Sequence, residues 1–205
     1  MPSSKYNEDV FVNCPFDHKY KKLFYAIIFA VFDCGFRARC SLEIMDTSEI
    51  RIESISKIIS ECKFGIHDIS RTQLDSKSNL PRFNMPLELG LFIGAKRFGQ
   101  NQQKKKCCIV LDSEPYRYQK FISDISGQDI SPHNNNQNKA IQIIRDWLRA
   151  ASPSVKIPGA TEMCRRYNSF CTDLPKICKV ALIKVSELTF NDYSTFVSDW
   201  LEENP

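Results

Sequence analysis

The feature that most constrains the fold is a repeated alternation of short apolar segments with longer segments of helical periodicity. Residues 9–15 (DVFVNCP) are apolar and partly β-branched, and residues 20–34 then place apolar side chains at helical spacing. Residues 36–44 predict a second strand, residues 50–63 a helix, and residues 64–69 (FGIHDI) a third strand. Parallel neighbours require crossover helices, so this alternation predicts a parallel sheet with helices on both faces.

The second half of the chain continues the alternation. Residues 104–112 (KKKCCIVLD) give the clearest strand, and the unbroken apolar run within them predicts an interior strand buried on both faces. The charged side chains of residues 36–44 favour an edge strand instead. We expect a helix over residues 116–125, a short fifth strand over 128–131 and an amphipathic helix over 139–151. The predicted fold class is α/β, with a flavodoxin-like parallel sheet of about five strands.

Prolines mark a boundary after the last of these helices. Pro153 and Pro158 separate an α/β domain, residues 1–152, from a helical C-terminal appendage, residues 153–205, which we expect to pack on the same core. Residues 190–201 predict the final helix of this appendage. No internal repeat accompanies the change, so the appendage is expected to complete the domain rather than duplicate it.

The cysteines predict a reducing environment. The chain has nine of them, none in a Cys-x-x-Cys pair, and most lie within apolar runs, which favours buried thiols over a disulfide framework or a zinc site. Cys164, Cys171 and Cys178 recur every seven residues, but Pro175 interrupts this spacing and no histidine lies nearby. We therefore expect these three cysteines to share one buried helical face and to bind no metal.

Composition restricts the function classes only weakly. The chain has 205 residues, 42% of them hydrophobic, and a formal charge of +4 that comes largely from local lysine clusters. Such a small excess gives no reason to expect a nucleic-acid partner. Residues 1–9 are polar, and no apolar run approaches the roughly 20 residues that span a bilayer. We therefore expect a cytoplasmic protein with no membrane partner.

One predicted helix carries an unusual carboxylate. Residues 85–95 contain a single ionisable side chain, Glu88, in a segment that is otherwise almost entirely apolar. Asn84 or the residue after it can serve as the N-cap of this helix, and Pro86 suits its first turn because the missing N–H would have no intrahelical partner there. Glu88 then lies in or just after the first turn, with apolar neighbours one turn further on. We expect its carboxylate to be held close to the core.

Polar side chains are concentrated where the first and third strands end. In parallel sheets ligands bind beyond the carboxyl ends of the strands, commonly between the first strand and the third. Residues 70–83 form an unusually long connection, which we interpret as a lid over this edge. Besides Glu88, the candidate site residues are Asn13, Phe16, Asp17, Asp68, Ser70, Arg71, Arg82, Phe83 and Asn84.

Residues 84–94 (NMPLELGLFIG) resemble the signature "N, two residues, F-E-L-G, two residues, I-G" of TIR-like predicted nucleotide-binding domains. The same segment resembles the glutamate-bearing helix of nucleoside 2-deoxyribosyltransferases. Residues 9–112 follow the order of elements of these folds, with weaker support from residues 11–13 and 68–70. Leu87 stands where the family usually has an aromatic residue. The resemblance implies a TIR-like parallel sheet.

The resemblance also implies cleavage of the nicotinamide–ribose bond of NAD, with Glu88 in the catalytic position. NAD would then be the substrate, and no cofactor is expected. A carboxylate beneath the ribose can stabilise an oxocarbenium-like transition state or attack it as a nucleophile. Under this interpretation Arg71 and Arg82 contact the pyrophosphate, and Phe16 or Phe83 stacks on a base. The family further implies self-association and a role in bacterial antiphage defence.

Other interpretations of the same residues stay open. A glutamate in the first helical turn is favoured by the helix dipole, Asp68 at a strand end can cap a turn, and Asn13 can satisfy loop backbone groups. A deoxyribosyl substrate would require a proton for the departing base, for which Asp68 and Asp17 are the candidate acids. Cys14 is expected to be an inert thiol. The alternative function is a non-enzymatic nucleotide-binding or TIR-type protein-interaction module.

Overall fold

Five parallel strands form a single sheet. The computed structural model describes residues 5–46, 48–72, 74, 79–125, 127 and 129–205. The strands are β1 (Asp9–Asn13), β2 (Arg37–Arg39), β3 (Phe64–Asp68), β4 (Cys107–Asp112) and β5 (Ile130–Pro132). Their spatial order is β2-β1-β3-β4-β5, so the chain builds outwards from β1 first in one direction and then in the other. This is flavodoxin-like topology, and the predicted fold class is confirmed.

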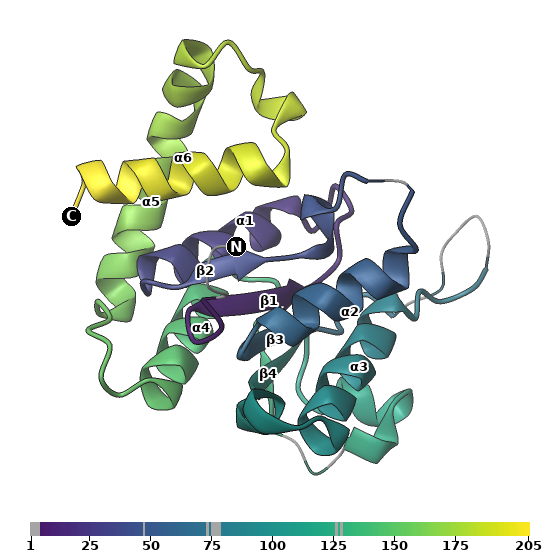
Figure 1. Ribbon diagram of the computed structural model, residues 1–205. Helices are drawn as coiled ribbons and strands as arrows, with labels where there is room; N and C mark the ends of the chain where they lie inside the picture. Colours follow the sequence, from purple (N-terminus) through teal and green to yellow (C-terminus); the bar gives the residue numbers. More distant parts are fainter. Residues whose placement is uncertain (1–4, 47, 73, 75–78, 126, 128) are drawn as a thin grey trace.

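Helices cover both faces of the sheet (Figure 1). The α-helices are α1 (Lys21–Asp33), α2 (Arg51–Glu61), α3 (Asn84–Phe98), α4 (Gln137–Ala151), α5 (Ala160–Val180) and α6 (Phe190–Glu203). α1 and α4 pack on one face and share the largest hydrophobic core with α5 and α6, whereas α2 and α3 pack on the other face. α3 begins one residue earlier than predicted, because Phe83 rather than Asn84 is its N-cap.

β1 shows why the sheet needs both helical layers. All of its residues are buried, Val10 and Val12 in the core beneath α1, and Phe11 in the smaller core beneath α2 and α3. Successive side chains of a strand point to opposite faces, so a strand without polar alternation has to be covered twice. β4 lies between β3 and β5, which confirms the predicted interior strand. The fifth strand exists as β5, although residue 128 of its predicted range lies outside the described residues.

β2 is the predicted edge strand, but it is much shorter than the predicted segment. Only three residues pair with β1, and the chain then turns into a 3₁₀ helix, η1 (Ser41–Glu43). Arg39 accounts for the turn, because its guanidinium group donates to Glu43 Oε1 at 2.9 Å and to Asp9 Oδ2 at 3.2 Å. These charge-assisted hydrogen bonds fold the chain back towards β1 instead of leaving it extended.

The predicted helix over residues 116–125 is wrong. The segment forms two short 3₁₀ helices, η3 (Arg117–Lys120) and η4 (Ser123–Ile125). Tyr116 has a φ of 57°, in the left-handed region, which a right-handed helix cannot include. Arg117 is held at the sheet instead, donating to Asp112 Oδ1 at 2.7 Å and to the Ile69 carbonyl oxygen at 2.7 Å. Long-range hydrogen bonds therefore override the local helical pattern.

The C-terminal helices extend the main core. Tyr193 of α6 stacks on Tyr25 of α1 with ring centroids 3.9 Å apart, and α5 continues through Pro175. All nine cysteines are free thiols. Cys178 is buried but Cys171 is exposed, so the prediction of one buried cysteine face is wrong. The buried face of α5 runs through Met163, Tyr167, Phe170, Leu174 and Cys178, so Cys171 lies beside this face.

None of the helices in the described residues combines the length and the apolar composition that crossing a membrane requires.

Gly65 in β3 tests the packing between the sheet and α3. A Cβ atom there would lie 2.7 Å from His67 Nε2 and 2.8 Å from Phe92 Cζ, which both belong to buried rings. We expect Gly65→Ala to lower the free energy of unfolding by about 1 to 3 kcal/mol through overpacking, measured by urea denaturation.

Gly90→Ala is the matched control for this measurement. A Cβ atom at Gly90, inside α3, meets nothing within 4 Å, so the variant should be about 0.5 to 1 kcal/mol more stable than the wild type. Equal effects of the two substitutions would contradict the close packing of β3 against α3.

Candidate functional site

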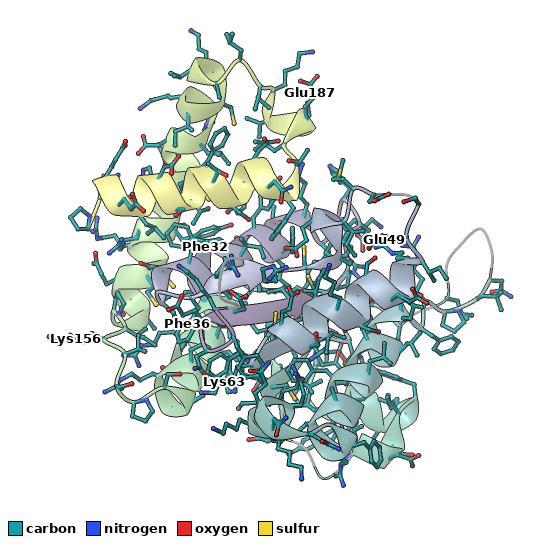
Figure 2. All side chains as sticks on the ribbon, in the orientation of Figure 1. Phe32, Phe36, Glu49, Lys63, Lys156 and Glu187 are labelled. Carbon is teal, nitrogen blue, oxygen red and sulfur yellow. The ribbon has the colours of Figure 1, made fainter. Side chains whose placement is uncertain are left out.

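A cleft of about 340 Å³ lies at the carboxyl ends of β1 and β3, at the predicted edge of the sheet. Its walls come from the loop after β1, from η1, from the starts of α2 and α3, and from the loop after β3. In Figure 2, Glu49 marks the end of α2 that lies at this edge, and Lys63 marks the opposite end. The lining residues are Asn13, Cys14, Pro15, Phe16, Asp17, Ser41, Arg51, Arg71, Arg82, Asn84, Met85 and Glu88.

Glu88 is the buried carboxylate of this cleft. It lies just after the first turn of α3 and is only 9% exposed, and its neighbours Leu89 and Phe92 are also buried. Among the residues that the structure describes, none hydrogen bonds to the Glu88 side chain or forms a salt bridge with it. Burying a carboxylate without such partners is unfavourable, and groups held in this way are concentrated at functional sites.

Burial also changes the acidity of Glu88. It raises the pKa of Glu88 to about 7, and the guanidinium group of Arg51 opposes this shift only in part. Near neutral pH the protonated and ionised forms are therefore present in comparable amounts. The charge of a ligand strongly affects the ionisation of such a carboxyl group, because a cation beside it favours the ionised form.

Arg51 is a site residue that the sequence does not reveal. It is the first residue of α2, and its Nη2 donates to Ser41 Oγ at 3.2 Å. In the sequence it resembles any solvated arginine at the start of an amphipathic helix. Only the strand order brings this end of α2 next to Glu88. With Arg71 and Arg82, it gives the cleft three guanidinium groups from separate segments.

Asp17 and Arg71 lie on facing loops of the cleft, as predicted from the strand ends. The distance between Arg71 Nε and Asp17 Oδ2 is 3.8 Å, so the pair is loose and partly exposed. Asp17 Oδ1 also accepts the backbone N–H groups of Lys19 at 3.0 Å and Tyr20 at 3.2 Å. Asp17 therefore shapes the chain that leads into α1 while it lines the cleft.

Asn13 holds α3 in place. It is only 2% exposed, and its Nδ2 donates to the Met85 carbonyl oxygen at 2.8 Å and lies 3.1 Å from His67 Nδ1. Burial and the Lys106 ammonium group lower the pKa of His67 to about 3, so the ring is neutral and its Nδ1 accepts the second amide proton. Asn13 thus ties β1 to the first turn of α3 and fixes the position of Glu88.

Asp68 and Ser70 are buried residues that do not line the cleft. Asp68 Oδ2 accepts the Tyr20 hydroxyl at 2.5 Å and lies 2.9 Å from His133 Nε2, and its Oδ1 accepts the Ser70 N–H at 2.8 Å. Although burial opposes ionisation, these contacts hold the pKa of Asp68 below its ordinary value. Of the two candidate acids, only Asp17 lines the cleft.

The remaining predicted residues lie around the mouth of the cleft. Phe16 and Asn84 belong to its lining, whereas Phe83, at the N-cap of α3, is exposed and does not. Of the predicted lid, residues 73 and 75–78 lie outside the described residues. Of the two phenylalanines, only Phe16 therefore lines the cleft.

A larger groove, of about 1080 Å³, lies between α3, β4 and α4. Its charged lining residues are all exposed, and they are Lys96, Arg97, Lys104, Asp129 and Asp146. None of its described lining residues is a buried acid, and the groove lies away from the carboxyl ends of β1 and β3. The buried carboxylate, rather than volume, identifies the smaller cleft as the candidate site.

The described residues bring together no group of three or more His, Cys, Asp or Glu side chains that could hold a metal ion.

Comparisons with known proteins add no identification: no protein-family model matches this chain, and no curated protein matches it.

The acidity of Glu88 predicts a pH-dependent stability. Its pKa is 4.5 ordinarily and about 7 in the fold, so folding favours the protonated form, and the folded protein loses stability as the pH rises from about 4.5 to about 7. Glu88→Gln removes this loss. We expect the variant to gain up to about 3 kcal/mol relative to the wild type between about pH 4.5 and pH 8, measured by urea denaturation. Glu202→Gln, on the exposed part of α6, should show no such trend.

Asp68 does not line the cleft, but its buried contacts predict that its substitution strongly lowers the free energy of unfolding. Asp68→Ala leaves the Tyr20 hydroxyl and His133 buried without their acceptor, and should lower the free energy of unfolding by about 3 to 5 kcal/mol. Tyr20→Phe removes one contact only and should cost about 1 to 2 kcal/mol. Chemical denaturation at pH 7 measures both values. A cost for Asp68→Ala below that of Tyr20→Phe would contradict the proposed network.

Proposed function

We propose that this chain is a nucleotide N-glycosidase that cleaves the nicotinamide–ribose bond of NAD, with Glu88 as its catalytic carboxylate. The observation that carries the proposal is a buried carboxylate, without a hydrogen-bond or salt-bridge partner among the described residues, in a cleft where parallel sheets of this topology bind ligands. The resemblance of residues 84–94 to TIR-like domains supports the same assignment. With that resemblance, the proposal includes self-association and a role in bacterial antiphage defence.

The electrostatics of Glu88 suit this reaction. As the bond between ribose and nicotinamide breaks, positive charge develops on the sugar, and a fixed carboxylate beneath it stabilises that charge or attacks the anomeric carbon. The cationic nicotinamide ring of the substrate favours the ionised form of a carboxyl group whose pKa is about 7. Substrate binding would therefore shift Glu88 to its ionised, reactive form, whereas in the absence of substrate the carboxyl group is partly protonated.

The leaving group also fits the lining of the cleft. Nicotinamide departs as a neutral molecule and requires no proton, so one carboxylate is sufficient. A deoxyribosyl substrate would need a second acid, and Asp68 is engaged in its buried contacts while Asp17 is paired loosely with Arg71. These placements favour a pyridinium leaving group over an ordinary nucleobase.

The decisive test is incubation of concentrated protein with NAD and measurement of released nicotinamide by liquid chromatography. We expect release by the wild type and a loss on the order of 10³-fold or more in Glu88→Gln, because the substitution removes the charge but keeps the shape of the side chain. Circular dichroism would confirm that the variant is folded, and Glu202→Gln would serve as the control with unchanged turnover. Full turnover by folded Glu88→Gln would exclude this role of Glu88.

A further inference from the structure

The charges of the cleft point to a phosphate-bearing ligand. Its lining carries three guanidinium groups, those of Arg51, Arg71 and Arg82, against the two carboxyl groups of Asp17 and Glu88. Among the described residues Arg51 forms no salt bridge, so its guanidinium group is available to an anion, and the charge of the cleft becomes more positive when Glu88 is protonated. Guanidinium groups recognise phosphate through paired, charge-assisted hydrogen bonds.

The backbone adds to this preference for an anion. α2 and α3 both begin at the cleft, and their N-cap residues, Ile50 and Phe83, make no side-chain hydrogen bond to the first N–H groups. The N-terminus of a helix carries a partial positive charge and favours anionic groups. The cleft also contains Glu88, a polar side chain that is nine-tenths buried and without a partner among the described residues. The end of the cleft formed by the N-termini of α2 and α3 thus favours an anion, and the part next to Glu88 favours a cation.

We propose that the unit recognised by this cleft is a nucleoside 5′-monophosphate with a cationic base, and that Arg51 anchors its phosphate. This inference rests on the proposed function and specifies its substrate class. The sugar lies over Glu88, and the phosphate lies at the ends of α2 and α3, where Arg51 meets Arg71 and Arg82 across the cleft. In a dinucleotide such as NAD, the second nucleotide extends towards Phe16 and the mouth of the cleft.

The volume of the cleft supports the choice of a mononucleotide unit. A cleft of about 340 Å³ lies near the lower end of the range of about 300 to 1,000 Å³ that is typical of small-molecule sites. Arg51 also starts in a favourable position, since its only hydrogen bond among the described residues is to Ser41 Oγ. The remaining N–H groups of its guanidinium can turn to a phosphate without breaking a salt bridge.

Three substrates that share the scissile bond test this inference. Nicotinamide riboside lacks the phosphate, nicotinamide mononucleotide has it, and NAD carries the additional nucleotide. We expect kcat/KM for the mononucleotide to exceed that for the riboside by on the order of 100-fold and to lie within about tenfold of that for NAD. Arg51→Gln should reduce the preference for the mononucleotide over the riboside by about tenfold or more, with little change in kcat/KM for the riboside. Arg165→Gln, on the exposed part of α5, is the matched control.

Failure of the inference and failure of the proposed function give different results. If the riboside is cleaved as well as the mononucleotide, or only NAD is cleaved, phosphate recognition by Arg51 is wrong while the glycosidase assignment survives. If none of the three is cleaved, calorimetric titration of the wild type and Arg51→Gln with the mononucleotide and the riboside decides. Tighter binding of the mononucleotide that depends on Arg51 would support the recognition, and equal binding of both would overturn it.

Discussion

The pairing of β1 with β3 is the constraint on which the rest of this structure depends. Asn13 lies opposite His67 in that pairing, so the two strands end side by side while the chain leaves them for different helices. No crossover connection fills the space between the departing loops, which is the general reason for ligand sites at such points. The loop after β1, the start of α2 and the first turn of α3 then form the walls of one cleft. Each wall is set by a strand register rather than by local sequence.

Buried polar contacts hold these walls in fixed positions. Asp68 joins Tyr20, from the segment leading into α1, to His133, which follows β5, so a single carboxylate ties three strand ends together. Asn13 performs the corresponding task for α3 through the Met85 carbonyl oxygen. Buried polar contacts of this kind are strong in a low-dielectric interior and make the surrounding core more rigid. The rigidity of the cleft therefore originates in buried polar residues, of which Asp68 lies beneath the cleft and Asn13 lines it.

The sequence was sufficient to predict the order of elements, the edge strand, the interior strand and the edge of the sheet where the cleft lies. These features depend on hydrophobic periodicity, which is local. The helix predicted over residues 116–125 fails because Arg117 bonds to Asp112, and that partner lies on another element. Arg51 was missed for a related reason, since its role comes from the place where α2 begins in space. Asp68 was correctly assigned to this edge of the sheet, but it is buried beneath the cleft instead of lining it. The sequence does not show that Tyr20 and His133 are its partners.

The position of Glu88 shows how the fold and the proposed chemistry are connected. A carboxyl group that is nine-tenths buried, with no hydrogen-bond partner among the described residues, destabilises the folded state in its ionised form, and Arg51 offsets that cost only in part. An uncharged side chain of the same shape would fit the helix better, so the requirements of stability alone do not account for a glutamate at this position. The unfavourable term is removed when a cation lies above the carboxylate and an anion meets the guanidinium groups. A ligand that carries both charges, separated by a ribose, would therefore compensate the buried charges of the cleft. Its cation would remove the electrostatic cost of ionising Glu88, and its anion would pair with the guanidinium groups.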